Sequence, residues 1–200
     1  MKAEDYYRRI EEKWKNDYPS SQNIEEIWDF YIECGYENPQ RTIGGILDKV
    51  GWIKKRVLDF GCDKGFMLDF ICKRYPSISG HGIDINRAAI EFARETFPDQ
   101  GFKAFDGLRI PYNDKYFDLV FVCAVIKHVR YEDRDRIYGE LNRVADKVFI
   151  IETDEKAREE VSYGTWTFYS SNFEEEFGKH FSPLKVIHEA GDLLGLYSCK

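Results

Sequence analysis

The chain has 200 residues, 43% of them hydrophobic, and its 36 acidic and 29 basic residues give a formal net charge of −7. This length suits one domain with a single core and is too short for two domains of full size. The acidic balance argues against a protein that binds nucleic acid through a broad basic surface. Because no apolar stretch approaches the roughly 20 residues that span a bilayer, and the N-terminus lacks the apolar core of a signal peptide, we expect a soluble, cytoplasmic protein without a membrane partner.

The N-terminal region is predicted to be helical. Residues 3–35 carry apolar side chains at helical spacing on either side of a break at Pro19, which predicts two amphipathic helices. A third helix is predicted after Pro39, and Gly51 is expected to end it. We therefore expect residues 1–52 to form a helical cap.

From residue 55 onward, short apolar runs alternate with helical patterns. Strands that alternate with helices predict a parallel sheet of right-handed βαβ units over residues 53–152. The predicted strands carry the segments RVLDF, GHGIDI, FKAF, FDLVFVC and KVFII.

The C-terminal segment, residues 153–200, is predicted to hold an insert, a last helix capped near Asn172, and a hairpin. PLKVIHEAGDLLGLYSCK predicts two strands with a short connection, which can only join antiparallel neighbours. The predicted fold is therefore one α/β domain, residues 1–200. It has a Rossmann-like, doubly wound, mostly parallel seven-stranded sheet that ends in an antiparallel C-terminal hairpin, with N-terminal helices.

Five cysteines are scattered along the chain and form no CxxC pair. The odd number and wide spacing argue against a disulfide framework and against structural zinc, so we expect reduced thiols and no metal site. They are Cys34, Cys62, Cys72, Cys123 and Cys199.

The stretch VLDFGCDKGFM joins the first predicted strand to a helix, where open α/β sheets bind ligands. A dinucleotide fingerprint G-x-G-x-x-G that starts at Gly61 fails at Asp63 and at Phe66, and an acid there would repel a pyrophosphate at the helix N-terminus. The P-loop pattern GxxxxGK[ST] is absent. An acidic loop suits a ligand that has an adenosine end, no phosphate and a positive charge, which describes S-adenosylmethionine.

The spacing of the acids agrees with this interpretation. Asp84 follows Gly61 by about 20 residues, the separation that places an acid at the end of the second strand beside a ribose. Gly61 and Gly65 allow a closer approach of backbone to ligand than a Cβ permits. Asp63 stands where a glycine is expected, but aspartate tolerates left-handed backbone angles better than most residues, so the loop need not be broken.

Four ordered segments carry a family resemblance over residues 55–150. VLDFGCDKG resembles the first motif of the class I S-adenosylmethionine-dependent methyltransferases, commonly VLDxGCGxG, and GIDINRAAIEFAR is similar to their second-strand segment. FDGLRIPYNDKYFDLVFVCAVIKHV resembles their third and fourth motifs. The resemblance implies S-adenosylmethionine as cofactor, with Asp84 on the ribose and Asp106 on the adenine amine. The cofactor-binding residues that it implies are Asp59, Gly61, Cys62, Asp63, Gly65, Asp84, Ile85, Asp106, Gly107 and Cys123.

Three of these acids have structural alternatives. Asp59 can instead accept loop N–H groups, Asp106 can be a turn residue before Gly107, and Asp84 can cap the helix that starts near Asn86.

A further stretch, NPQRTIGGILDKVGWIKKRVLD, resembles the segment before the first motif in the O-methyltransferases of ubiquinone biosynthesis. That resemblance implies that Arg41 holds the methionine carboxylate, for which a guanidinium is well shaped. The alternative is a surface arginine near a helix start.

His128 is the candidate general base, because it follows the carboxyl end of the fourth strand in a position where the family often has histidine. The alternative is that its imidazole caps the next helix or bonds to the backbone. His81 is expected to precede its strand, at the opposite edge of the sheet, and His180 and His188 belong to the predicted C-terminal helix and hairpin.

The predicted acceptor is a small molecule, methylated on oxygen in preference to nitrogen or carbon. Its pocket is expected between residues 1–35 and 153–170, where the insert carries Tyr163, Trp166, Phe168 and Tyr169. No [DNS]-P-P-[YWF] follows the fourth strand, which argues against many DNA methyltransferases. The alternatives are a non-catalytic S-adenosylmethionine-binding sensor or partner subunit, and a protein or RNA methyltransferase. The residues do not predict an oligomeric state.

Overall fold

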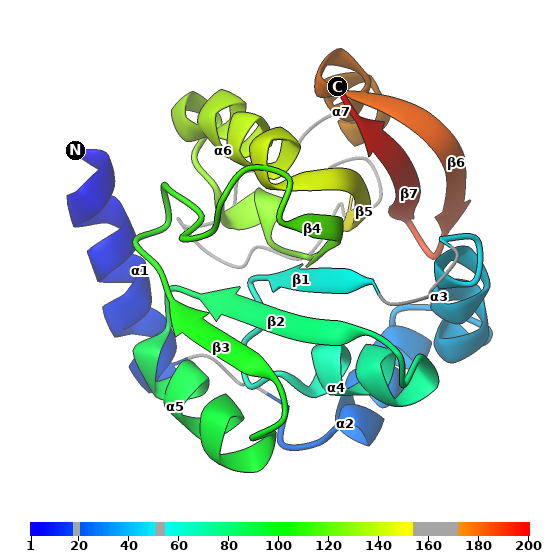
Figure 1. The fold of residues 1–200 in the computed structure, drawn as a ribbon, viewed down its shortest axis with the longest axis horizontal. Helices are drawn as coiled ribbons and strands as arrows, with labels where there is room; N and C mark the ends of the chain where they lie inside the picture. The colour runs from blue at the N-terminus through cyan, green and yellow to red at the C-terminus, as the bar shows by residue number, and fades with distance from the viewer. Residues whose placement is uncertain (18–20, 51–54, 154–171) are drawn as a thin grey trace.

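The computed structural model describes residues 1–17, 21–50, 55–153 and 172–200, without the side chains of residues 14–17. Their centre is a seven-stranded sheet with the order β3-β2-β1-β4-β5-β7-β6 (Figure 1). The first five strands pair in parallel, as predicted. They are β1 (Arg56–Phe60), β2 (Ser79–Asp84), β3 (Gly101–Ala104), β4 (Phe117–Cys123) and β5 (Ala145–Thr153).

The sheet ends in the predicted antiparallel hairpin of β6 (Phe181–Glu189) and β7 (Asp192–Cys199). Ala190 and Gly191 connect the two strands, with φ angles of 52° and 83°. Two successive left-handed residues make the kind of tight turn whose twist matches that of a hairpin. Beside the hairpin lies α7 (Phe173–His180), which Asn172 caps as predicted by accepting the N–H of Glu175 at 3.0 Å.

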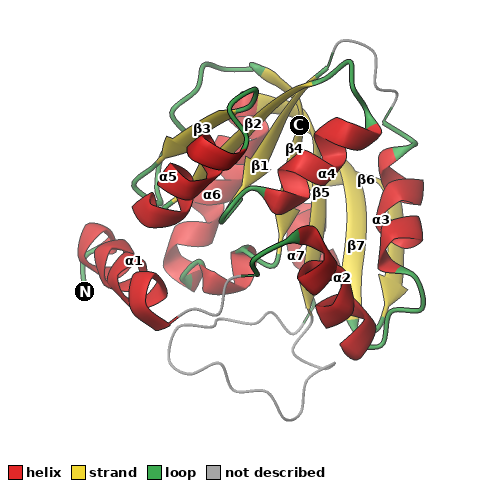
Figure 2. Cartoon of the chain, turned by 90° about the horizontal axis from the view of Figure 1, so that it is seen from below, coloured by secondary structure: helices red, strands yellow, loops and turns green. Residues whose placement is uncertain are grey.

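Helices cover both faces of the sheet, which explains why its central strands are apolar on both sides. One face carries α2 (Ile24–Glu33), α3 (Pro39–Leu47), α4 (Phe66–Arg74) and α5 (Arg87–Thr96), and Figure 2 views the fold from this side. The other face carries α6 (Tyr131–Val144) and α7. The doubly wound arrangement is thereby confirmed.

The remaining long helix, α1 (Ala3–Asp17), packs against the loops that follow β2 and β3 rather than on either face of the sheet (Figure 1). Its buried side chains are Tyr6, Tyr7 and Ile10, which contact Leu108. The helix therefore covers the edge of the sheet where the parallel strands end.

Two details differ from expectation. Helix α3 ends at Leu47, before Val50, which is buried in the turn that follows; Gly51 lies outside the described residues. His81 lies within β2 rather than before it, and its ring contacts Tyr112 and Phe117. Among the helices that the structure describes, none combines the length and the apolar character needed to cross a bilayer.

Candidate functional site

The loop between β1 and α4 turns sharply because three of its residues have left-handed backbone angles. The φ angles are 79° at Gly61, 45° at Asp63 and 85° at Gly65, so aspartate tolerates the conformation as expected. A Cβ at Gly61 would lie 2.4 Å from Cγ2 of Val125. Glycine is thus required at position 61 by both the conformation and the space.

The N–H groups of this loop are already engaged within the protein. Gly61 and Cys62 both donate to the carbonyl oxygen of Ile83, at 2.8 and 3.0 Å. Asp63 donates to Oδ2 of Asp84 at 2.9 Å, and Gly65 donates to the oxygen of Cys62 at 2.8 Å. These four N–H groups are therefore not available to the pyrophosphate of a dinucleotide.

Asp84, at the end of β2, is the buried acid that organises the loop. Its Oδ2 accepts the N–H of Asp63, and its Oδ1 accepts the N–H of Asn86 at 2.8 Å. Burial raises the pKa of Asp84 to about 6, although both backbone hydrogen bonds act to lower it. Each oxygen retains a second lone pair, so the carboxylate can still accept the hydroxyls of a ribose.

Asp84 opens onto a cavity, which we call the loop cavity, whose empty space is about 390 Å³ when the open solvent at its mouth is included. Apart from this acid and the imidazole of His128, the lining is apolar or aromatic, as in sites that hold a flat, largely apolar ligand with few polar anchors. The lining residues are Tyr7, Ile10, Phe60, Gly61, Asp84, Ile85, Phe105, Gly107, Val125, His128 and Val129.

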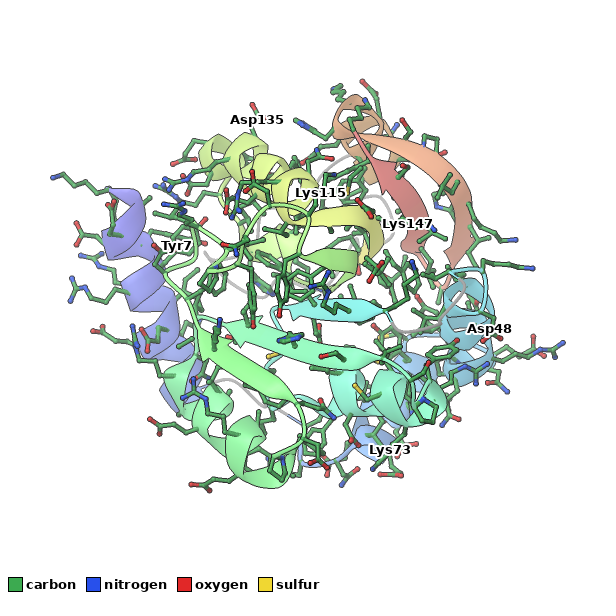
Figure 3. All side chains as sticks on the ribbon, in the orientation of Figure 1. Tyr7, Asp48, Lys73, Lys115, Asp135 and Lys147 are labelled. Atoms are coloured by element: carbon green, nitrogen blue, oxygen red, sulfur yellow. The ribbon has the colours of Figure 1, made fainter. Side chains whose placement is uncertain are left out.

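Helix α1 closes one side of the loop cavity. The Tyr7 hydroxyl donates to Oδ2 of Asp133 at 3.1 Å, and the Tyr6 hydroxyl donates to the backbone oxygen of His128 at 3.0 Å. A Cβ at Gly107 would lie 2.7 Å from the Tyr7 ring, on the inner flank of α1 (Figure 3). From the sequence, this helix is expected beside the acceptor. Its amphipathic pattern predicts that one face is buried, but the pattern does not identify the residues that cover that face.

Asp59 lies beneath the loop and is 2% exposed. Its Oδ2 has no hydrogen-bond partner among the residues that the structure describes, so no loop N–H is bound there. Burial, reinforced by the nearby charges of Asp84 and Asp63, raises the pKa of Asp59 to about 8. Asp59 is therefore mainly protonated at neutral pH. Burial likewise raises the pKa of Asp63 and of the Cys62 thiol.

Several predicted site residues do not line the loop cavity. Asp106 is exposed, and its Oδ1 accepts the N–H groups of Leu108 and Arg109 at 2.8 and 2.9 Å, as in the turn alternative. Arg41 is exposed on α3. Cys123 is within 2.7 Å of the Tyr31 hydroxyl, and burial raises the pKa of its thiol to about 12.

A second pocket, the β5 pocket, lies between α2 and the ends of β4, β5 and β7. Its empty space is about 290 Å³, and two buried acids and a buried lysine contribute to its walls. The lining residues are Phe30, Tyr31, Cys34, Ala124, Lys127, Ile151, Glu152, Thr153 and Asp192.

Glu152 and Asp192 are residues that sequence analysis missed. Asp192 accepts hydrogen bonds from the hydroxyls of Tyr36, at 3.0 Å, and Thr153. Glu152 accepts the N–H groups of Val125 and Ile126 through Oε1. The available signal was an acid at the carboxyl end of an otherwise apolar strand, KVFIIET.

Within the described ranges, no three His, Cys, Asp or Glu side chains gather as a metal site requires. The four insert aromatics, Tyr163, Trp166, Phe168 and Tyr169, lie outside the described residues.

Comparison with known proteins identifies this architecture. Residues 57–147 match the family described as "Methyltransferase domain". The chain is 33% identical over 97 residues to norajmaline N-methyltransferase of Rauvolfia serpentina, covering 46% of this chain and 32% of that protein. It is 30% identical over 115 residues to malonyl-[acyl-carrier protein] O-methyltransferase of Legionella pneumophila, covering 52% and 39%. The chain thus spans about a third of the length of these curated relatives.

Solved structures share the fold over more of the chain. The PH0226 protein from Pyrococcus horikoshii OT3 matches with a TM-score of 0.69 and 20% identity, covering 98% of this chain and 99% of that one. A SAM-dependent methyltransferase from Aquifex aeolicus matches with a TM-score of 0.61 and 21% identity, covering 81% and 93%. At these identities the likeness establishes the fold.

Proposed function

We propose that this chain is a class I S-adenosylmethionine-dependent methyltransferase and that it transfers a methyl group from S-adenosylmethionine to an oxygen of a small molecule. The observation that carries the proposal is Asp84, a buried carboxylate that lines the loop cavity and fixes the glycine loop. The match of residues 57–147 to the methyltransferase domain supports the resemblance that the sequence motifs carried.

The residues of the loop cavity fit this cofactor. The carboxylate of Asp84 suits the two ribose hydroxyls, and the apolar surface of Ile85 and Gly107 suits an adenine ring. The loop N–H groups of Gly61, Cys62, Asp63 and Gly65 are engaged within the protein and are not available to a phosphate. Contacts of the cofactor with Asp106, Arg41 and Cys123 are proposed on the family resemblance alone.

When bound, the cofactor supplies a methyl group that its positively charged sulfur has already activated. The chain then has to hold the acceptor in line with that methyl group and exclude water, and such positioning is worth roughly 7–11 kcal/mol at best. A hydroxyl acceptor also needs a proton acceptor. His128, which lines the loop cavity, remains the candidate from the sequence for that role.

Nitrogen is the second candidate for the methylated atom. Two matching relatives from Rauvolfia serpentina, 33% and 32% identical, are named as N-methyltransferases, whereas the Legionella relative is named as an O-methyltransferase. A protein or RNA acceptor, a non-catalytic role and a cytoplasmic location stay predictions from the sequence.

A label-transfer screen tests the proposal. The full chain is incubated with methyl-labelled S-adenosylmethionine and with chemically defined hydroxyl, amine and carboxylate compounds, and then with fractionated metabolites. We expect label in a small molecule from the wild type and none from Asp84→Ala. Cofactor binding without any transfer across the whole screen would contradict catalysis and favour a sensor.

The screen also tests His128. If His128 is the general base, His128→Ala lowers turnover far more than cofactor affinity. Loss of cofactor binding with little change in turnover per bound enzyme would exclude His128 as the general base.

A further inference from the structure

Glu152 uses only one of its two carboxylate oxygens within the protein. Glu152 is 1% exposed. Its Oε1 accepts the N–H of Val125 at 2.7 Å and that of Ile126 at 2.5 Å. Oε2 is buried without a hydrogen-bond partner in the part of the chain that the structure describes. A buried carboxylate oxygen that lacks a partner costs free energy, and Glu152 lines a pocket from which a ligand can supply that partner.

The β5 pocket and the loop cavity share a single stretch of chain as a common border. Ala124 and Lys127 line the β5 pocket, whereas Val125 and His128 line the loop cavity. This stretch follows β4 and includes a short 3-10 helix, Ile126–His128. The bonds from its backbone to Oε1 of Glu152 hold this shared wall in place. A group bound in the β5 pocket is therefore a close neighbour of a cofactor bound in the loop cavity.

We propose that the β5 pocket holds the methyl acceptor, that this acceptor presents a neutral hydroxyl or amine, and that Oε2 of Glu152 accepts its hydrogen bond and then its proton. The proposal rests on the proposed function, because it assigns the acceptor of the same reaction. It makes Glu152 a catalytic residue and a determinant of specificity, since a carboxylate that accepts hydrogen bonds favours protic groups and repels an acceptor carboxylate.

The step balances without another reactant. A lone pair of the acceptor oxygen or nitrogen forms a bond to the methyl carbon, and the carbon–sulfur bond breaks with its electron pair left on sulfur. The positive charge of the sulfonium is thereby neutralised, and the proton of the acceptor passes to Oε2 of Glu152. The products are the methylated acceptor, a neutral thioether and a protonated Glu152, which returns its proton to solvent on product release.

The surroundings of Glu152 suit a proton acceptor that works near neutral pH. Burial raises the pKa of Glu152 to about 7, against the lowering effect of Lys127 and of the two backbone N–H bonds. A base is most efficient when its pKa is close to the working pH. Among the described residues, the other charged or titratable groups near Glu152 are Arg134 and Tyr138 on α6, Cys123 on β4, Asp192 on β7, and Tyr31 and Cys34 at the C-terminal end of α2.

The test compares Glu152→Gln with Asp146→Asn. Glutamine keeps an oxygen for the N–H groups of Val125 and Ile126, so the wall is expected to remain. Asp146 is an exposed carboxylate at the opposite end of β5, so its variant controls for loss of an acid from the same strand. The probes are labelled S-adenosylmethionine and defined phenols, amines and carboxylic acids.

We expect transfer by the wild type to hydroxyl or amine compounds and not to carboxylic acids, at a rate that rises with pH through a midpoint near the pKa of Glu152. Glu152→Gln is expected to lower the single-turnover rate by about 10²–10⁴-fold and to abolish that pH dependence. Its S-adenosylmethionine affinity is expected to stay within about threefold of the wild type, because Glu152 does not line the loop cavity. Asp146→Asn is expected to behave as the wild type.

Full activity in Glu152→Gln, a pH profile that only His128→Ala removes, or preferred transfer to carboxylic acids would overturn the inference and leave the proposed function intact. An equal loss of cofactor binding and of rate in Glu152→Gln would overturn it too, because Glu152 would then belong to the cofactor site. Absence of transfer to every compound by the wild type would instead overturn the proposed function itself.

Discussion

The loop cavity and the β5 pocket lie on opposite sides of the same short stretch after β4, and each contains a fully buried carboxylate with a raised pKa. Asp84 in the loop cavity has a backbone N–H on each oxygen. Glu152 in the β5 pocket has both of its N–H groups on Oε1 and none on Oε2. Asp84 is held through both oxygens, which suits an acceptor of hydrogen bonds from a ligand that does not react at that point. Glu152 has one unpartnered oxygen, which is able to take up a proton.

The largest effect is expected from removing the fixed acid. Asp84→Ala deletes the acceptor of two ribose hydroxyls, and hydrogen bonds to charged groups contribute about 1.5–3 kcal/mol each. Calorimetry should therefore show S-adenosylmethionine binding weakened by roughly a hundredfold or more. Asp99→Ala, at an exposed position after α5, is the control and should bind as the wild type. Equal affinity in Asp84→Ala and Asp99→Ala would remove Asp84 from the site.

The next effect concerns the glycine loop. Gly61→Ala places a Cβ in a left-handed backbone conformation and 2.4 Å from the Val125 side chain. We expect urea unfolding to reveal a loss of about 1–3 kcal/mol and calorimetry to reveal weakened cofactor binding. Gly139→Ala, in α6 with open space around it, should instead leave stability unchanged or raise it by up to about 1 kcal/mol. A Gly61→Ala protein as stable as Gly139→Ala would contradict the geometry of the loop.

The buried acids predict that stability falls as pH rises. The pKa of Asp59 in the folded chain, about 8, lies above its ordinary value of 3.8, so the folded state binds more protons between these two values. The contribution of Asp59 to the free energy of unfolding is therefore complete below its ordinary pKa and is lost as pH rises through about 8. Between these two pKa values the free energy of unfolding falls by up to about 1.4 kcal/mol per pH unit. Asp84 and Glu152 act in the same direction.

Urea unfolding of the wild type and of Asp59→Asn at pH 5, 7 and 9 measures this contribution. We expect the free energy of unfolding to decline less steeply with pH in Asp59→Asn, and Asp99→Asn to follow the wild type. Identical slopes for the wild type and Asp59→Asn would indicate that Asp59 is ionised at neutral pH.

The smallest effect is expected at the wall that α1 contributes to the loop cavity. Tyr7→Phe removes only the hydrogen bond from the hydroxyl to Oδ2 of Asp133. Arg130 still pairs with that oxygen, so we expect a loss of about 0.5–1.5 kcal/mol, as for a neutral hydrogen bond. Thermal unfolding should show this loss, together with faster proteolysis within α1. Tyr116→Phe is the control, because the Tyr116 hydroxyl has no hydrogen bond to any described residue. Greater resistance of α1 to proteolysis in Tyr7→Phe would contradict the docking seen here.

The sequence predicts the sheet and the loop cavity better than it predicts the β5 pocket. The order of βαβ units, the glycine loop and the spacing from Gly61 to Asp84 are local patterns, and each determines a position at the carboxyl edge of the sheet. The resemblance to the methyltransferases and the cofactor that it implies followed from these motifs. The antiparallel hairpin followed from a connection too short for a crossover.

The remainder depends on contacts between distant segments. The loop cavity includes Tyr7 from α1 and Val125 from beyond β4, and nothing local in either segment indicates that they meet. The sequence shows Glu152 as an acid at the end of an apolar strand. It does not show that one carboxylate oxygen lacks a partner, because that depends on where the backbone after β4 lies. Placement of Arg41 and Asp106 on the cofactor still rests on resemblance.

The most direct test of the central claim is a calorimetric titration of the wild-type chain with S-adenosylmethionine and, in parallel, with NAD⁺. The loop cavity predicts binding of S-adenosylmethionine with a micromolar Kd and no measurable binding of NAD⁺, because the loop N–H groups are engaged and the adjacent acids repel a pyrophosphate. Binding of NAD⁺ as tight as that of S-adenosylmethionine, or no binding of S-adenosylmethionine, would contradict the account.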